Sequence, residues 1–286
     1  MNGWPALQAL ACLSAFALTA GCAPTASEPT DTPRAVRIAV CQTFCIDSDI
    51  EGNLQRIDLA LHEAAAQEAD MATFPETALI GWVNPAAHEL ATPIPGALSD
   101  RIGELARRYE MMIAIGLCEK AGDRLHDSAI LVDRDGALLL KHRKINILTE
   151  LMDPPYTPGS RADIAAVDTR FGRIGMLICA DTFVEENVKA LAALEPDVVL
   201  VPYGWAAPVN AWPQHGESLA AWVSHVARTT RAPVVGTDLV GMISTGPWQG
   251  MTYGGQSPVA DATGEIIATL RDRDAEVRVI EVLLGS

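Results

Sequence analysis

The feature that most constrains this chain is a regular alternation, from Val36 onward, between short apolar runs and longer amphipathic stretches. Short apolar runs bounded by turn residues are typical of strands, and apolar residues that recur every three or four positions are typical of helices. Leu54, Ile57, Leu61 and Ala64 recur in this way. Neither a repeat nor an internal linker interrupts the pattern, which therefore predicts one α/β domain with mixed sheets.

The pattern also predicts where the elements lie. Asp135-Gly136 and Thr263-Gly264 each separate two apolar runs, which is a hairpin signal. We expect helices at 50–68, 98–109, 185–194 and 217–230. We expect strands at 35–40, 71–74, 111–117, 128–132, 137–140, 173–178, 198–201, 234–237, 256–260, 265–270 and 277–282.

The N-terminal segment is typical of a targeting signal. Residues 7–20 are apolar without any charge and lead into Leu18-Thr-Ala-Gly-Cys22, after which residues 23–33 are rich in Pro, Thr and Ser. This order resembles a lipoprotein signal. We expect a signal peptide at 1–21, a lipid on Cys22, a tether at 22–34 and the folded domain at 35–286. The alternatives are an uncleaved anchor, although the run is short for a bilayer span of about 20 residues, or an ordinary signal cut nearby.

Such a signal predicts an exported protein that is lipid-anchored at the bacterial cell envelope, in the periplasm or at the outer membrane. The formal charge of −15 and the sequence pI near 4.7 argue against nucleic acid as a partner. The largest basic cluster is the short run Lys141 to Lys144.

The cysteines of the folded part allow two interpretations. Disulfides form in exported proteins, but the sequence cannot choose a pairing among four cysteines. Cys41 and Cys118 follow apolar runs, which favours buried free thiols. None of the cysteine spacings resembles a metal-binding knuckle and the six histidines are scattered, so neither a metal nor another cofactor is expected. The cysteines outside the signal are Cys41, Cys45, Cys118 and Cys179.

Three polar residues, Glu76, Lys144 and Cys179, each follow an expected strand. Alone, each residue has an ordinary structural explanation. Glu76 can be a solvated cap at a strand end, Lys144 can be part of a solvent-exposed basic surface, and Cys179 can be an unreactive buried thiol. A cysteine becomes a nucleophile only as thiolate, whose pKa near ~8.5 falls beside a cation or a proton acceptor. If the three strands are neighbours in one sheet, the three side chains converge on one edge, and lysine and glutamate supply what the cysteine needs.

The surroundings of these residues resemble the nitrilase superfamily of carbon-nitrogen hydrolases, whose members carry a glutamate, a lysine and a cysteine in this order. The matching motifs are FPET at 74–77, HRKI at 142–145 and GMLICAD at 175–181, and the resemblance extends over about 36–283. It implies a four-layer α-β-β-α sandwich that assembles into a homodimer or a larger oligomer.

The resemblance also implies residue roles. Cys179 attacks the substrate carbon and forms a thioester, Glu76 transfers protons, and Lys144 and the backbone amide of Ala180 stabilise the developing oxyanion. A second glutamate orients the lysine in many members. Glu150 is our choice for it, and Glu119 is a competitor.

The sequence departs from the family directly after the cysteine, where Ala180-Asp181 replaces the usual aromatic and acidic pair. This disfavours a nitrile substrate and leaves amide, carbamoyl and acyl-transfer reactions open. Tyr203 and Trp205 follow a strand where the family often contacts its substrate, although simple packing explains them equally well. The expected function is hydrolysis of an amide or carbamoyl bond with release of ammonia or an amine. The alternatives are an acyltransferase and a non-catalytic lipoprotein binding module.

Overall fold

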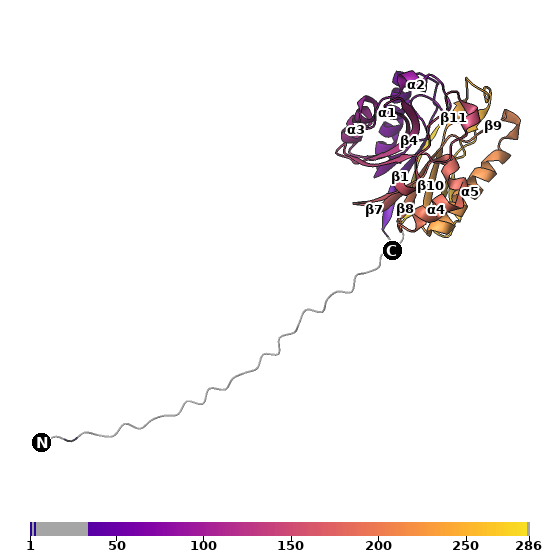
Figure 1. The fold of residues 1–286 in the computed structure, drawn as a ribbon. Coiled ribbons are helices and arrows are strands. Elements are labelled where there is room, and N and C mark those ends of the chain that lie inside the picture. The colour runs from indigo at the N-terminus through magenta and orange to yellow at the C-terminus, as the bar shows by residue number, and fades with distance from the viewer. Residues whose placement is uncertain (2, 4–33, 285–286) are drawn as a thin grey trace. The chain divides into compact units, whose positions relative to one another are not determined.

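The computed structural model describes residues 1, 3 and 34–284, and the fold is formed by the last of these ranges (Figure 1). The predicted lipidation site at Cys22 lies outside the described residues, as do residues 4–21 of the predicted signal peptide. None of the helices in the described ranges is long and apolar enough to cross a bilayer.

Two six-stranded sheets form the centre of the fold. The first has the order β15 (Glu276–Leu283), β1 (Ala35–Gln42), β2 (Met71–Thr73), β3 (Met112–Ala121), β4 (Arg124–Val132) and β5 (Leu138–Arg143). The second has the order β14 (Ile266–Thr269), β13 (Pro258–Ala260), β10 (Val234–Asp238), β8 (Val198–Tyr203), β7 (Gly172–Met176) and β6 (Ala166–Thr169). Within each sheet three neighbouring strands run parallel, β1-β2-β3 in the first and β10-β8-β7 in the second.

The remaining elements cover these sheets or extend from them. The helices are α1 (Ile50–Ala66), α2 (Ala87–Leu90), α3 (Ala97–Tyr109), α4 (Glu185–Ala192) and α5 (Gln214–Thr230). A small third sheet consists of β11 (Val240–Met242), β12 (Thr252–Gly254) and β9 (Ala206–Ala207). Short 3-10 helices lie at Thr149–Leu151, Arg161–Asp163, Cys179–Phe183 and Val209–Ala211.

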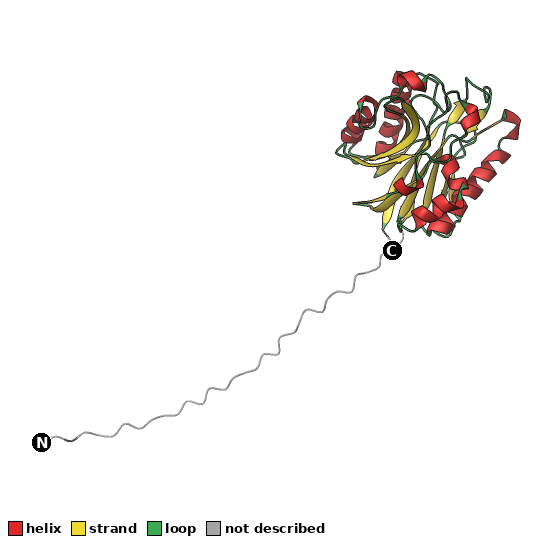
Figure 2. Cartoon of the chain, in the orientation of Figure 1, coloured by secondary structure: helices red, strands yellow, loops and turns green. Residues whose placement is uncertain are grey.

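The layers follow the predicted order α-β-β-α. Helices α1 and α3 pack on the first sheet, and α5, with α4 beside it, packs on the second (Figures 1 and 2). The two sheets face each other, with β1 against β10 and β3 against β8. The predicted four-layer sandwich is therefore confirmed.

Strand β1 shows how the sequence produces these layers. Val36, Ile38 and Val40 point into the core between the sheets, whereas Ala39 and Cys41 point into the core beneath α1 and α3. Successive side chains of a strand point to opposite faces, so a strand that is covered on both faces must be apolar throughout. This is why the inner strands appear in the sequence as short continuous apolar runs.

The structure differs from the sequence prediction in two ways: it contains additional short elements, and some strands have other ends than predicted. Every predicted strand and helix is present, but β6, α2 and the small third sheet were not predicted. Strand β5 runs three residues beyond the predicted end at Leu140, because its pairing with β4 continues to Arg143 opposite Ser128. Lys144 is consequently the first residue after the strand.

Candidate active site

Glu76 lies in the loop after β2 and is fully buried. Gly116 of β3 holds this loop, since its N–H donates to the Pro75 carbonyl at 3.0 Å and its carbonyl accepts from the Ala78 N–H at 3.0 Å. A Cβ on Gly116 would lie 2.5 Å from the Glu76 Cα, so this close approach requires glycine. Glu76 Oε1 accepts a hydrogen bond from Lys144, and Oε2 has no hydrogen-bond partner among the described residues.

Lys144 is buried directly after β5. Its ammonium donates to Glu76, lies 3.4 Å from Asp127 Oδ2 and lies 5.4 Å from the centroid of the Trp82 ring. Burial is the largest effect and opposes the charge, but Glu76, Cys179 and Asp127 together outweigh burial, so the pKa of Lys144 is raised. Lys144 therefore stays a cation although its side chain is buried.

Cys179 lies three residues beyond the end of β7, at the start of the 3-10 helix Cys179–Phe183. Its φ of +40° is unusual for a residue with a side chain and marks a sharp turn at the strand exit. The Thr182 hydroxyl donates to the Cys179 carbonyl at 2.7 Å and closes that turn. A sharp turn of this kind presents the side chain to a pocket while the backbone stays packed.

The environment of Cys179 favours the thiol over the thiolate at rest. Burial raises its pKa most and the charge of Glu76 raises it further, whereas Lys144 and the backbone N–H of Gly204 act in the opposite direction. The pKa stays well above its ordinary value. Cys179 can therefore become a nucleophile only when a base removes its proton during the reaction.

The other three cysteines of the described chain have a different character. Cys41, Cys45 and Cys118 are free and buried, and burial is the largest cause that raises the pKa of each. None of them lines the pocket that contains Cys179. Free buried thiols were the favoured prediction for Cys41 and Cys118.

A pocket of about 200 Å³ brings the site together. Lys144 and Cys179 both line it, and Glu76 lies against Lys144. The three strands that precede these residues are not neighbours in one sheet, so the condition under which their side chains were expected to converge on one sheet edge is not met. Glu76 and Lys144 follow strands of the first sheet and Cys179 follows β7 of the second. The full lining is Trp82, Lys144, Leu148, Cys179, Ala180, Phe183, Gly204, Trp205, Ala206, His215 and Trp248.

Asp181 connects the two halves of the site and was not among the predicted site residues. Its Oδ1 accepts hydrogen bonds from the backbone N–H groups of Ile145 and Asn146, both at 2.8 Å. Its Oδ2 accepts from the Ile178 N–H at 3.2 Å and lies 2.8 Å from His142 Nε2. One carboxylate thus fixes the residue before Cys179 and the two residues after Lys144.

Asp127 is a second buried acid at the site that was not predicted from the sequence. It lies on β4, fully buried, and neither of its oxygens has a hydrogen-bond partner within 34–284. The signal was present in the sequence, because Asp127 is a charged residue within the strand sequence Leu-His-Asp-Ser-Ala-Ile-Leu-Val. A carboxylate inside an apolar strand is costly unless it has a function or a partner.

Glu150, the predicted partner of Lys144, lies elsewhere. It is exposed in the 3-10 helix Thr149–Leu151 and lines a different pocket. Within the described chain, the carboxylates within 4 Å of the Lys144 ammonium are those of Glu76 and Asp127. The structure thus does not bring Glu150 to Lys144, because the chain turns outward after Leu148.

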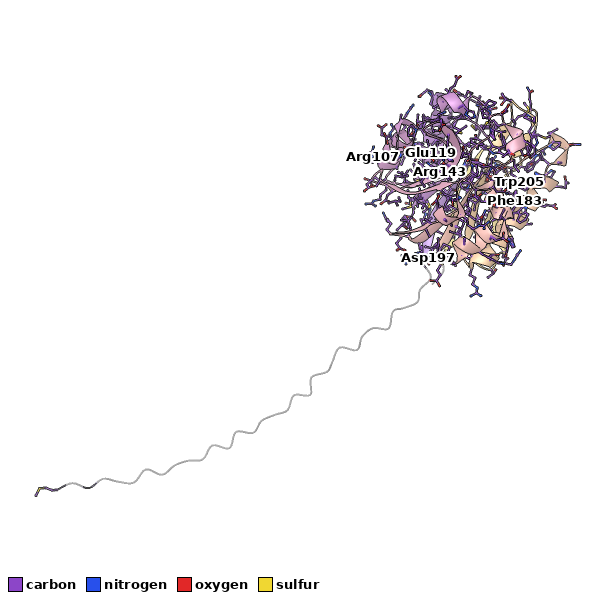
Figure 3. The ribbon with its side chains drawn as sticks, viewed as in Figure 1. Arg107, Glu119, Arg143, Phe183, Asp197 and Trp205 are labelled. Carbon is purple, nitrogen blue, oxygen red and sulfur yellow. The ribbon has the colours of Figure 1, made fainter. Side chains whose placement is uncertain are left out.

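Glu119, the competitor, is buried on β3 but binds other cations. It accepts hydrogen bonds from Arg143, Lys141 and Ser128, and the shortest donor–acceptor distance to each of the three residues is 2.7 Å. Figure 3 shows Glu119 beside Arg143. Burial opposes its ionisation, yet these hydrogen bonds prevail and lower its pKa from 4.5 to about 2. Glu119 therefore fixes β5, the strand that leads to Lys144, without contacting Lys144 itself.

The predicted substrate-contacting residues separate into two kinds. Trp205 lines the pocket and stacks on His215 at a centroid distance of 4.8 Å. Ala180, the residue predicted to donate its backbone N–H to the oxyanion, lines the same pocket. Tyr203 is fully buried outside the lining, with its hydroxyl 3.3 Å from Thr182 Oγ1. Phe183 and Trp205 lie next to each other (Figure 3), with ring centroids 5.5 Å apart.

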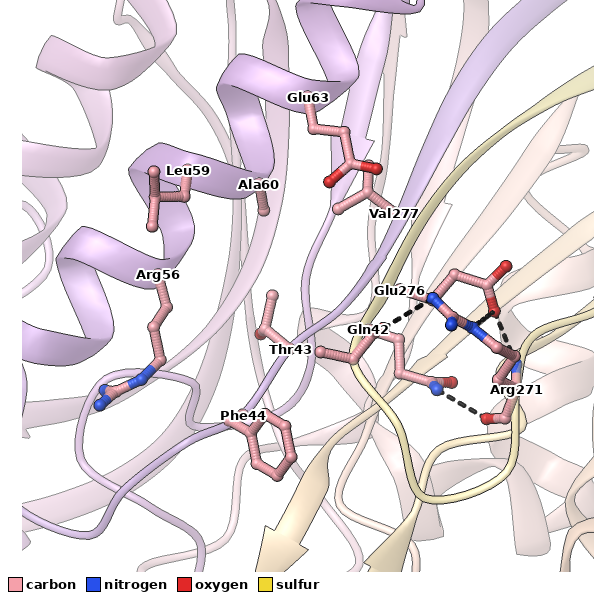
Figure 4. Close-up of a pocket in the computed structure, with 11 residues that line it drawn as sticks. Gln42, Thr43, Phe44, Arg56, Leu59, Ala60, Glu63, Arg271, Glu276 and Val277 are labelled. Carbon is pink, nitrogen blue, oxygen red and sulfur yellow. Dashed lines mark hydrogen bonds and ion pairs between the residues drawn. The ribbon is translucent and has the colours of Figure 1, made fainter.

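A second pocket, of about 360 Å³, lies between α1 and residues 271–277 (Figure 4). Gln42 lines this pocket, and its side-chain amide donates a hydrogen bond to the Arg271 carbonyl at 2.8 Å. It shares no lining residue with the pocket around Cys179 and contains no cysteine. The lining of this second pocket therefore contains none of the three predicted catalytic residues. Within the described residues there is also no cluster of three His, Cys, Asp or Glu side chains that could hold a metal.

Comparison with known families matches residues 37–286 to a family described as Carbon-nitrogen hydrolase. The chain belongs to the carbon-nitrogen hydrolase family. The hydrolase is 28% identical over 249 residues to an (R)-stereoselective amidase from a Pseudomonas species, covering 86% of this chain and 85% of that protein. It is 26% identical over 255 residues to a nitrilase from Pyrococcus abyssi, covering 86% of this chain and 89% of that protein. A third relative, Nitrilase 3 of an unknown prokaryotic organism, is 29% identical, but the match spans only 53% of its length.

Solved structures show the same fold. A crystal structure of an amidase from Nesterenkonia has a TM-score of 0.76 and 21% identity to the hydrolase, covering 90% of this chain and 94% of that one. Another structure of that amidase, in a mutant form, carries the acetamide moiety of fluoroacetamide added covalently at its active-site cysteine, with a TM-score of 0.75. At this identity the likeness supports the nitrilase-type architecture alone.

Proposed function

We propose that the hydrolase cleaves the carbon-nitrogen bond of an amide through a thioester on Cys179 and releases ammonia or an amine. The observation that carries the proposal is the placement of Cys179 and Lys144 on one pocket, with Glu76 buried against Lys144. Glu76 Oε2 has no hydrogen-bond partner in the described chain, so it is free to accept a proton.

In the first half of the reaction, Glu76 Oε2 takes the proton of the Cys179 thiol while Sγ bonds to the amide carbon. The carbonyl oxygen becomes an oxyanion, which the Lys144 ammonium and the backbone N–H of Ala180 stabilise. Each well-placed donor contributes about 3 kcal/mol to such a transition state. The carbon-nitrogen bond then breaks, the nitrogen takes the proton from Glu76, and a thioester remains on Cys179.

In the second half, Glu76 removes a proton from water and the resulting hydroxide attacks the thioester carbon. The carbon-sulfur bond breaks, the carboxylic acid leaves, and the thiolate recovers its proton from Glu76. Proton transfer therefore uses one carboxylate in both directions, and no group outside the site is needed. The permanent charge of Lys144 serves both oxyanions.

The test is ammonia release from a panel of primary amides, carbamoyl compounds and nitriles. We expect release from amides by the wild-type protein and none by Cys179→Ala. Cys41→Ala is the matched control, because Cys41 is an equally buried cysteine beneath α1 and should retain the activity. Undiminished release by Cys179→Ala would disprove the assignment.

We also propose the cellular setting, which rests on the sequence alone. The segment ending at Cys22 supports a signal peptide at 1–21, a lipid on Cys22 and a tether at 22–34 ahead of the hydrolase domain. The mature protein is then anchored at the cell envelope by its lipid. The resemblance to the nitrilase superfamily likewise supports assembly into a homodimer or a larger oligomer.

A further inference from the structure

The pocket around Cys179 has an apolar wall. Trp82 and Trp248 meet edge to face with centroids 5.7 Å apart on one part of the lining, and Phe183 meets Trp205 in the same way on another. Leu148 and Ala206 add aliphatic surface. Aromatic side chains of this kind bind apolar groups and gain little from a charged one.

The charges at the pocket lead to the same conclusion. Lys144 is the charged residue of the lining, and its ammonium already pairs with Glu76. His215 is the other titratable nitrogen base there, and burial lowers its pKa, so its ring is neutral at neutral pH. A carboxylate on the acyl part of a substrate would enter this pocket without a counter-ion, which is costly.

We infer that the acyl group of the substrate is small, uncharged and apolar, either alkyl or aromatic. This inference rests on the proposed function, since it names the substrate class of the same site. The volume of about 200 Å³ lies below the roughly 300–1,000 Å³ of pockets for drug-sized ligands. Amides of dicarboxylic acids, whose second carboxylate is ionised, are excluded as good substrates.

The test compares 4-methylpentanamide with succinamate, which have the same shape but differ in charge. Binding is measured on Cys179→Ala by tryptophan fluorescence, because Trp82, Trp205 and Trp248 line the pocket. We expect the neutral amide to bind at least tenfold more tightly. Equal or tighter binding of succinamate, or no binding of the neutral amide, would overturn the inference. This variant performs no chemistry, so failure of the proposed function appears separately, as absent ammonia release by the wild type.

A charge-gain variant tests the same inference from the other direction. His215→Arg places a permanent cation at the lining, and a guanidinium can stack on Trp205 as the imidazole does. We expect succinamate to bind at least tenfold more tightly to the double variant Cys179→Ala/His215→Arg than to Cys179→Ala, with no such gain for 4-methylpentanamide. Equal gains for the two ligands would contradict the inference.

Asp127 supports a second inference on independent grounds. It pairs with Cys118 across β3 and β4, and both its oxygens lack a hydrogen-bond partner in the described part of the chain. The ammonium of Lys144, at 3.4 Å from Oδ2, is nearer to Glu76. Two buried carboxyl groups therefore compete for one cation.

The groups around Asp127 leave it no other counter-ion. Its charged and titratable neighbours are Glu76 from the loop after β2, Lys144 after β5, Cys118 on β3, Tyr156 and Asp181. Burial raises the pKa of Asp127 most, and the charge of Glu76 raises it further. With both carboxyl groups ionised, the site would hold a net negative charge before Cys179 loses its proton.

We propose that Asp127 is a positioning residue that keeps its proton in the working enzyme and thereby leaves Glu76 as the ionised base on Lys144. Loss of that proton at high pH turns Asp127 into a rival anion for the ammonium. The additional negative charge also opposes formation of the thiolate. Ionisation of Asp127 thus sets the alkaline limit of activity.

The test is the pH profile of kcat/KM for Asp127→Asn, whose amide has the shape of the neutral acid and cannot ionise. We expect kcat/KM at pH 7 within about tenfold of the wild type, and an alkaline limb at least one pH unit higher. A limb shifted by less than that, or a larger loss at pH 7, would overturn the proposal.

A measurement on the wild-type protein covers the case in which Asp127→Asn fails to fold. Isotope-edited infrared spectra with labelled aspartate should show the carbonyl band of a protonated carboxylic acid at pH 7. The band should weaken as the pH rises through the alkaline limb of activity. Asp238 is also buried and its pKa is raised, but it accepts hydrogen bonds from two backbone amides, so Asp238→Asn identifies its share of the band. A spectrum of Asp238→Asn without such a band would contradict the proposal.

Discussion

His142 Nε2 lies 2.8 Å from Asp181 Oδ2, and both side chains are buried. His142 belongs to β5, two residues before Lys144, and Asp181 follows Cys179 by two residues. The contact therefore joins the two sheets at the point where each delivers a residue to the pocket. Together with the hydrogen bonds from Ile145 and Asn146, it sets the position of Lys144 relative to Cys179.

Asp181→Asn should destabilise the protein and lower its activity. The asparagine amide would turn an NH₂ group toward donors that now share a carboxylate, and each buried donor left without a partner costs about 1–3 kcal/mol. We expect a loss of about 2–4 kcal/mol in the free energy of unfolding, measured with urea. Asp168→Asn is the control, because Asp168 pairs with Arg173 at the surface, where solvent weakens ion pairs and the loss of stability should be small. Equal losses in the two variants would contradict this account.

Lys144→Met should keep most of the buried volume and lose the charge. Without the ammonium the oxyanion has one donor fewer, so we expect kcat to fall by about a hundredfold to a thousandfold. Lys189→Met is the control, since Lys189 pairs with Glu185 on an exposed helix face and should leave kcat unchanged. A normal kcat in Lys144→Met would remove the oxyanion role.

Glu119 should make folding sensitive to acid. Its pKa is lowered to about 2 in the folded state, so it contributes stability above its ordinary value of 4.5 and loses it as the pH falls toward 2. The shift corresponds to about 3 kcal/mol. We expect Glu119→Gln to be less stable at pH 7 and to show a smaller decrease in unfolding free energy between pH 4.5 and 2. If the unfolding free energies of the wild type and Glu119→Gln fell in parallel with pH in that range, the stabilising role of the hydrogen bonds to Glu119 would be contradicted.

The lipid anchor can be tested in cells. A fatty-acid probe should label the wild-type protein, and Cys22→Ser should abolish the label. Cys12→Ser provides a control, because Cys12 lies within the predicted signal peptide and should not affect labelling. Equal labelling of Cys22→Ser and the wild type would rule out the lipid on Cys22.

The sequence was informative where a local pattern determines the structure. The apolar runs predicted the strands, since each inner strand is covered on both faces, and helices α1 and α3 to α5 followed from their spacing. The motifs around Glu76, Lys144 and Cys179 marked residues that the fold does bring together, with Lys144 and Cys179 on one pocket and Glu76 against Lys144.

The residues that the sequence did not reveal depend on pairing between distant segments. Asp127 reaches Lys144 only because β4 pairs with β5, and Asp181 reaches the chain after Lys144 only because the two sheets face each other. Glu150 was chosen by its nearness to Lys144 in the chain, yet the backbone turns it toward solvent. Sequence distance carries no information about such turns.

The central claim is that Cys179 carries the acyl group during turnover. The most direct measurement is peptide mass spectrometry of the wild-type protein, quenched in acid during turnover of 4-methylpentanamide. We predict a mass increase equal to the acyl group on the peptide that contains Cys179, removed by hydroxylamine and absent from Cys179→Ala. Steady ammonia release with no such adduct on that peptide, or with the adduct on another residue, would contradict the account.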